Sequence, residues 1–423
     1  MLIPVLIVIT AVAAAWSLVA GRLERRHVRA PLVLVLAGVV TGLFTHSQIA
    51  VALNSEVAQR VAEIILAVLL FVDATELRGG RLFGRFPGAA ARVLLVALPL
   101  SLGATVLLGG ALLPELPVAA LLLIACVVIP TDFAPAEILV RDRRIPVRVR
   151  SVLNVESGYN DGIVSPLFLF ALVLAGSTSE KRTPAEALAT TVPFAVKALV
   201  AGALIGALLA WLMNLAQRAD WMTAQSGRIT VLVVPLLVYT STTEMHGNGF
   251  VASFVAGVAF RYVRQAPQRH GAAEHSGSEF QLIEDTSALM TMVMWFFFGN
   301  AVVLTFVVGL DWSVLLLCTA ALTVLRIGPV LLSLLGSPLS RRERLMIAAL
   351  GPRGTTSIVF GLLAFNALPD GPAANSALDS MVLVVLGSIL LHGGGSLAIA
   401  RVLRGSPRAR TNTETETGAD AQR

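Results

Sequence analysis

The sequence predicts an all-α polytopic membrane protein, and three observations lead to this fold class. Of the 423 residues, 56% are hydrophobic and 14% are charged, with a mean hydropathy of +0.80. In soluble domains, roughly 45–50% of residues are apolar and about 25% are charged. Apolar runs of the length that crosses a bilayer as a helix, roughly 20 residues, follow one another along the chain. Arginines gather in alternate connections between these runs. A soluble fold is therefore excluded.

Hydropathy and helix-breaking residues divide the chain into thirteen predicted spans. A signal peptide has basic residues before its apolar run, and the first apolar run of this chain has none. We therefore expect this run to be retained as a membrane span. The predicted spans cover residues 2–20, 30–45, 57–76, 89–112, 117–140, 150–176, 189–214, 228–244, 248–262, 282–308, 312–336, 345–367 and 378–402.

The basic residues predict how the spans are oriented. Loops rich in arginine stay on the cytoplasmic side, and they follow spans one, three, five, seven, nine and eleven. The N-terminus is therefore expected outside and the C-terminus in the cytoplasm. The net charge of +6 then reflects loop placement beside a lipid bilayer, and no nucleic-acid partner is predicted. Residues 404–423 are polar and low in complexity, which predicts a disordered tail.

The sixth span contains the densest group of polar side chains. An ionisable group at bilayer depth costs at least about 2.5–3.5 kcal/mol on insertion scales, so those that persist line a pathway or pair with one another. Residues four apart share a helix face, so Glu156 lies above Asn160 and Ser157 above Asp161. Carboxylate and hydroxyl oxygens are the ligands of hard cations. The pattern favours a site for a small monovalent cation over a purely structural polar cluster.

The fifth and twelfth spans contain helix-breaking residues at corresponding places. Pro130 and Pro135 flank Asp132 in the fifth, and Gly351–Gly354 interrupts the twelfth. Two interrupted helices in matching positions indicate a secondary transporter with an inverted repeat, here spans 1–6 repeated as 8–13. We expect Asp132 to neutralise the positive ends of the half-helices and Arg353 the negative ends.

Two further charges lie within predicted spans. Asp73 is near the cytoplasmic end of the third span, where it either lines the ion route or anchors the helix end. Arg326 lies within the eleventh span and requires an acidic partner. We expect this partner to be Glu156, because Asp161 must stay available for the cation.

These residues together resemble the first family of monovalent cation/proton antiporters, the NhaP-like bacterial sodium/proton exchangers. The likeness covers residues 1–403 and rests on Thr131-Asp132, Glu156-Ser157, Asn160-Asp161, Arg326 and Gly351–Gly354. It implies an NhaA-like antiporter fold, no cofactor, and a homodimer in which a core bundle moves against an interface domain. The implied core bundle is residues 89–176 and 312–402, and the implied interface domain is residues 1–76 and 189–308.

The resemblance also implies roles for the site residues. Asp161 would bind cation and proton in turn, Thr131 and Ser157 would be further cation ligands, and Asp73 would assist. Glu156 and Arg326 would form a structural ion pair that Asn160 supports, and Asn160 beside Asp161 favours exchange of one cation for one proton. The family motif Thr-Asp-Pro is Thr131-Asp132-Phe133 here, which leaves the contribution of Thr131 open.

The sequence thus predicts an antiporter of the cell membrane that exchanges Na⁺, or Li⁺ or K⁺, for H⁺ and contributes to pH homeostasis. Cation and proton would compete for Asp161, with alternating access. We find neither a phosphate-binding GxxxxGK[ST] nor an HExxH motif, so an enzyme is not expected. A K⁺-selective antiporter is the main alternative, and a cation channel or an intramembrane enzyme is a more distant one.

Overall fold

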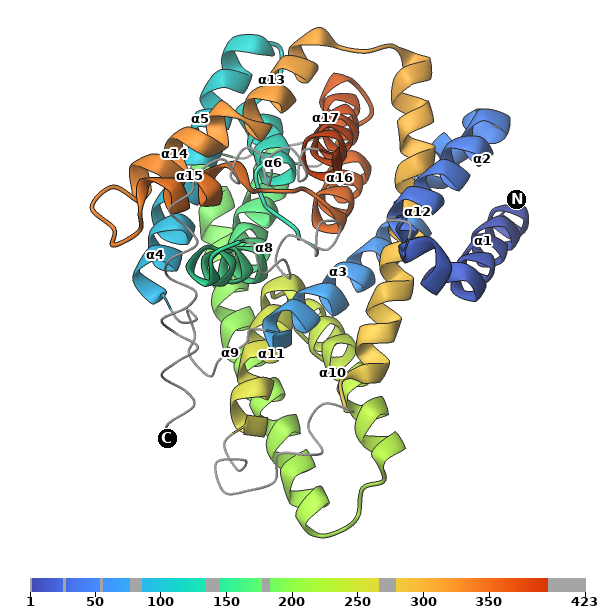
Figure 1. The fold of residues 1–423 in the computed structure, drawn as a ribbon, viewed down its shortest axis with the longest axis vertical. Helices are drawn as coiled ribbons and strands as arrows, with labels where there is room; N and C mark the ends of the chain where they lie inside the picture. Colours follow the sequence, from blue (N-terminus) through green and yellow to red (C-terminus); the bar gives the residue numbers. More distant parts are fainter. Residues whose placement is uncertain are drawn as a thin grey trace, which may run out of the picture.

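A computed structural model describes most of the chain, and all of its regular elements are helices (Figure 1). The predicted disordered tail, residues 404–423, lies outside the described residues, as do residues 134–140 of the predicted fifth span. The described residues are 2–25, 28–53, 56–76, 86–133, 145–176, 183–265 and 279–394.

Within the described residues, each predicted span contains one helix or a series of shorter ones. Seven helical segments in the described ranges are long and apolar enough to cross a membrane by themselves, so the count of thirteen spans stays a prediction. The N-terminal half contains α1 (Leu2–Glu24), α2 (Ala30–Leu53), α3 (Glu56–Glu76), α4 (Pro87–Arg92), the π-helix η1 (Val93–Ala97), α5 (Leu98–Leu112), α6 (Val118–Val128) and α8 (Val147–Ala175). The C-terminal half contains α9 (Pro184–Arg218), α10 (Ala224–Glu244), α11 (Gly249–Gln265), α12 (Gln281–Val308), α13 (Trp312–Leu322), α14 (Val324–Ser333), α15 (Arg341–Ala349), α16 (Thr355–Ala367), α17 (Pro372–Ser388) and the π-helix η4 (Ile389–Gly394).

Three of these helices, α9, α10 and α15, begin with a capping box. The hydroxyl of Thr183 accepts a hydrogen bond from the Glu186 N–H, and the Glu186 carboxylate accepts one from the Thr183 N–H. Ser340 and Glu343 repeat the arrangement at the start of α15. These bonds satisfy N–H groups that have no partner inside the helix.

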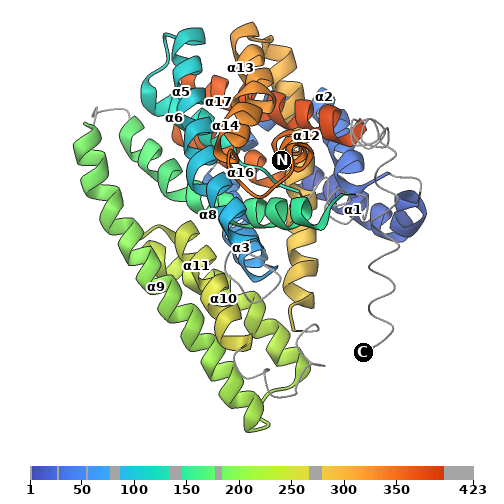
Figure 2. The same cartoon turned by 60° about the vertical axis from the view of Figure 1, so that its left-hand side comes forward.

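Small residues allow helices to approach one another closely, as in other membrane proteins. Gly38 of α2 and Gly299 of α12 face each other, and a Cβ atom on either would collide with backbone of the other helix. Gly202 and Gly206 of α9 meet the backbone of α11 in the same way. These two contacts join α2 to α12 and α9 to α11, which lie side by side in Figures 1 and 2.

The buried apolar residues form three clusters. The largest includes residues of most helices, among them α2, α3, α5, α6, α8, α12, α13, α16 and α17, and the second joins α4, η1, α8, α14 and α15. The third joins α3, α9, α10, α11 and α12, and α9, α10 and α11 lie in the lower part of Figure 1. Helix α8 contributes to the first two clusters and also packs against α3, α9 and α11, so its polar residues lie where the clusters meet.

The predicted interruption of the twelfth span is present, and the described part of the fifth span ends in a non-helical segment that contacts it. The first follows α6, where residues 129–133 are not helical, and the second separates α15 from α16 at residues 350–354. The backbone N–H of Asp132 donates a hydrogen bond to the carbonyl of Pro352 at 2.8 Å. The two non-helical segments therefore lie against each other.

The structure also contains an interruption that the sequence does not predict. The expected continuous span 312–336 is divided at Thr323, which has φ −120° and ψ −95° between α13 and α14. Arg326 lies in the first turn of α14, directly after this break. Pro329 follows three residues after Arg326. A proline distorts a helix at the carbonyl four residues before it, so Pro329 does not predict a break at Thr323.

Candidate functional site

Asp161 lies in the middle of α8 with its side chain almost fully buried. It is 3% exposed, and the Thr356 hydroxyl donates a hydrogen bond to its Oδ2 at 2.7 Å. The other oxygen, Oδ1, is buried and has no hydrogen-bond partner among the described residues. Ser157, one helical turn earlier, is partly exposed and accepts a long bond of 3.4 Å from the Phe133 N–H. Asp161 thus offers one oxygen that is free to bind an ion.

Thr356 was not among the residues that the sequence singles out. It follows the Gly351–Gly354 interruption in a run of Thr355, Thr356 and Ser357. A hydroxyl in the first turn after a helix break is a weak signal on its own. The contact becomes visible in the structure, where the two non-helical segments meet and α16 lies against α8.

Asn160 holds the interrupted segment after α6. Its Nδ2 donates hydrogen bonds to the Thr131 carbonyl at 2.7 Å and to the Thr131 hydroxyl oxygen at 3.0 Å. The Thr131 hydroxyl in turn donates to Glu156 at 3.4 Å. In this structure Thr131 therefore faces Asn160 and Glu156, and its expected role as a cation ligand stays a prediction.

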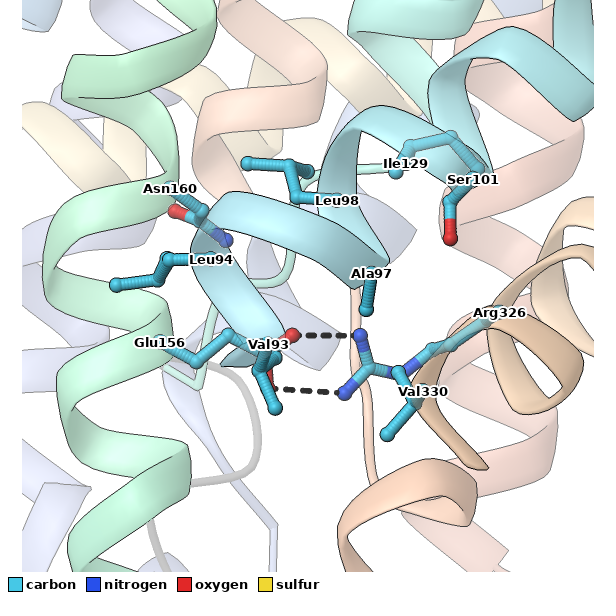
Figure 3. A pocket seen from close by; sticks show the side chains of 10 residues that line it. All are labelled: Val93, Leu94, Ala97, Leu98, Ser101, Ile129, Glu156, Asn160, Arg326 and Val330. Carbon is cyan, nitrogen blue, oxygen red and sulfur yellow. Dashed lines mark hydrogen bonds and ion pairs between the residues drawn. The ribbon is translucent and has the colours of Figure 1, made fainter. Parts of the chain in front are cut away.

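Arg326 and Glu156 form a bidentate ion pair. The distances are 2.6 Å from Nη1 to Oε1 and 3.2 Å from Nη2 to Oε2, and both side chains are 5% exposed. Arg326 Nη2 also donates to the carbonyls of Ile347 and Leu350 at 3.3 and 3.0 Å. Figure 3 shows the pair beside a small pocket that also includes Asn160. One arginine thus links α8, α14 and the end of α15.

Asp132 lies at the N-terminal end of α16. Its Oδ2 accepts a hydrogen bond from the Thr355 N–H at 2.7 Å, which is a backbone donor without a partner inside the helix. A carboxylate at this end is favourable because the helix dipole is positive there. The electrostatic role expected for Asp132 stays a prediction, and this contact supports it.

Arg353 is completely buried, with 0% exposure, between the ends of two other helices. Its Nε donates to the carbonyl of Val128, the last residue of α6, at 2.7 Å. Nη1 donates to the Gly351 carbonyl, and Nη2 reaches the Ala321 carbonyl near the end of α13 at 3.5 Å. Terminal carbonyls carry the negative end of the helix dipole, which is the partner expected for this cation.

Asp73 lies near the end of α3 and is partly buried. Helix α3 packs against both α8 and α16, so Asp73 belongs to an element that adjoins the site. Its participation in the ion route stays a prediction.

The aromatic side chain of Phe254 in α11 covers α8 next to Asp161. Phe254 packs edge-on against Tyr159, with centroids 5.5 Å apart and planes at 70°. It also lies directly over Gly162, where a Cβ atom would be 2.7 Å from the ring. Gly162 therefore lets an aromatic side chain seal this side of α8, a contact that the sequence does not predict.

The chemistry of the site is that of oxygen ligands. Within the described part of the chain, no group of three or more His, Cys, Asp and Glu side chains could hold a metal ion. The Asp161 carboxylate accepts a hydrogen bond from the Thr356 hydroxyl, and Ser157, one turn earlier on α8, has a second hydroxyl. Such atoms suit a monovalent cation or a proton bound to one carboxylate.

Comparisons with known proteins agree with this reading. At 26% identity over 364 residues, the chain is similar to a Na⁺/H⁺ antiporter of Schizosaccharomyces pombe, with 79% of this chain and 75% of that protein covered. It is 24% identical over 284 residues to the K⁺/H⁺ antiporter NhaP2 of Shewanella sp. strain MR-4, covering 67% of this chain. The matched part spans about half, 47%, of that relative's length.

The fold is shared with a solved antiporter. The structure of the sodium proton antiporter MjNhaP1 from Methanocaldococcus jannaschii at pH 8 superimposes with a TM-score of 0.73 and 20% identity, covering 96% of this chain and all, 100%, of that one. The model of the family "Sodium/hydrogen exchanger, transmembrane" matches residues 7–402. The protein therefore belongs to the transmembrane sodium/hydrogen exchanger family, with the NhaP-type antiporter fold.

Proposed function

We propose that the protein exchanges a monovalent cation, Na⁺ in the first instance, for H⁺ across the cell membrane. The observation that supports this most directly is the state of Asp161. Its carboxylate is buried, one oxygen is bound by Thr356, and the other has no partner among the described residues. A buried charge without a counter-ion is costly, so this group favours occupation by a proton or a cation.

Exchange follows from the energetic cost of the empty site. Either a proton or a Na⁺ ion neutralises Asp161, and the loaded site can then pass between the two sides of the membrane. An empty, ionised site crosses slowly because its charge has lost its hydration. In the proposed motion, the core bundle of residues 89–176 and 312–402 moves against the remaining helices, within a homodimer.

The electrostatics around Asp161 support exchange of one cation for one proton. Glu156 and Arg326 neutralise each other at hydrogen-bonding distance. Asn160 is neutral and donates to the Thr131 backbone. The Asp132 carboxylate is bound at the N-terminal end of α16. Asp161 is then the carboxylate that binds either ion, so each turnover moves one charge in each direction.

Reconstituted liposomes containing a pH-sensitive dye test the proposal. We expect an imposed Na⁺ gradient to move protons, with saturation, and without a current. Asp161→Asn should abolish this exchange while the purified protein keeps its thermal stability. Ser165→Ala is the matched control, because Ser165 lies one turn further along α8 with a buried hydroxyl that has no partner among the described residues.

Three results would contradict the proposal. Exchange that persists in Asp161→Asn would remove the residue from the mechanism, and proton flux without a counter-cation would indicate a channel. Exchange driven by K⁺ but not by Na⁺ would favour the potassium alternative, which is the activity in the name of the Shewanella relative. Parallel assays with Na⁺, Li⁺ and K⁺ separate these outcomes.

A further inference from the structure

The Thr356 hydroxyl is built into the ion site from the opposite half of the chain. Thr356 is 195 residues from Asp161 in sequence and lies in the first turn of α16, with 4% exposure. Its hydroxyl donates to Asp161 Oδ2 at 2.7 Å, a length normal for a hydrogen bond from a hydroxyl group. Nothing in the sequence pattern assigns Thr356 to the site.

The first turn of α16 is fixed from two directions, so the position of Thr356 is set by its surroundings. Asp132 binds the N–H of Thr355 at 2.7 Å. On the other side, the N–H of Arg353 donates to the Ser388 hydroxyl of α17 at 2.7 Å. A turn held in this way keeps the threonine hydroxyl close to Asp161 without any contribution from a bound ion.

The neighbouring hydroxyls show that this contact is selective. Thr355 and Ser357 are also buried, with 2% and 1% exposure, but their hydroxyl oxygens have no hydrogen-bond partner among the described residues. Of three consecutive hydroxyl side chains, Thr356 is the one that reaches the carboxylate. The site therefore distinguishes Thr356 from two chemically similar neighbours.

A hydroxyl that donates to a carboxylate stabilises the ionised form over the protonated form. We propose that Thr356 is a positioning residue of the exchange site: its bond to Oδ2 weakens proton binding at Asp161, leaves Oδ1 for the cation, and so sets the pH range in which Na⁺ displaces H⁺. This inference rests on the proposed function. Other charged groups on the elements around Asp161 are Asp132, Asp73, Arg353 and the Glu156–Arg326 pair.

The experiment removes the hydroxyl and retains the shape of the side chain. Thr356→Val, Thr356→Ser and the control Ser357→Ala are reconstituted, and Na⁺/H⁺ exchange is measured between pH 5 and 9. We expect the half-maximal pH of Thr356→Val to rise by about one to two units, the equivalent of a hydrogen bond to a charged group. Thr356→Ser should return the profile to that of the wild type, and Ser357→Ala should leave it unchanged.

The apparent KM for Na⁺ gives a second readout. In Thr356→Val it should rise at low pH, where protons compete, and return to the wild-type value at high pH. A slower Thr356→Val with an unchanged pH profile would overturn the inference, as would a serine variant that shifts as far as the valine variant. Wild-type liposomes without exchange would instead contradict the proposed function, so the two failures are distinguishable.

Discussion

The buried pair of Glu156 and Arg326 gives a quantitative test of how the site is held together. We expect Arg326→Met to destabilise the protein strongly, because methionine fills much of the volume but leaves the Glu156 carboxylate without its cation. The same change removes the donor that reaches the carbonyls of Ile347 and Leu350. The effect should therefore appear as a loss of folded protein.

The magnitude follows from the burial of the pair. Both side chains are 5% exposed, and removal of one partner from a buried ion pair costs about 3–5 kcal/mol. That loss lowers the ratio of folded to unfolded protein by about a hundredfold to a few thousandfold. A surface ion pair would change the same ratio by about fivefold or less.

Thermal unfolding of the purified protein in detergent, combined with a double-mutant cycle, is the appropriate assay. In Arg326→Met with Glu156→Gln the carboxylate is neutral, so we expect this double variant to be clearly more stable than Arg326→Met alone. If Arg326→Met unfolds at the wild-type temperature, the pair does not stabilise the fold. If the two substitutions are simply additive, the interaction energy that we derive from the pair is absent.

Two further predictions concern contacts next to the site. Gly162→Ala should slow exchange, because the added methyl group would meet the Phe254 ring at 2.7 Å. Adding Phe254→Leu should restore much of the rate, and a slow double variant would show that the collision is not the cause. Asp132→Asn should lower the stability by about 0.5–2 kcal/mol because the charge at the N-terminus of α16 is lost; unfolding measured by intrinsic fluorescence would reveal it, and an unchanged transition would contradict the helix-end role.

The sequence predicts the fold class because lipid imposes strong constraints on composition. Each long apolar run had to be helical, and the all-helical antiporter fold is confirmed. The interruptions after Val128 and at Gly351–Gly354 were recognisable because proline and glycine mark them. The break at Thr323 has no comparable residue signal.

The site was predictable in part for a similar reason. Charged residues such as Asp161, Glu156 and Arg326 are conspicuous inside apolar spans, and the structure brings the last two together. Hydroxyl side chains are common in membrane helices and cost little to bury, so Thr356 did not stand out. The direction of the Thr131 side chain could not be predicted either, because it depends on the hydrogen bonds that Asn160 donates to a non-helical segment.

The contact between the two non-helical segments determines when the site can form during synthesis. Asp132 contacts Pro352 and Thr355, and Asp161 contacts Thr356, so both carboxylates depend on partners that leave the ribosome about two hundred residues later. A nascent chain that ends before Pro352 must hold these acids in the bilayer, or keep them hydrated, without their final partners. A fragment that ends after the first repeat therefore lacks Thr355 and Thr356, the partners of Asp132 and Asp161.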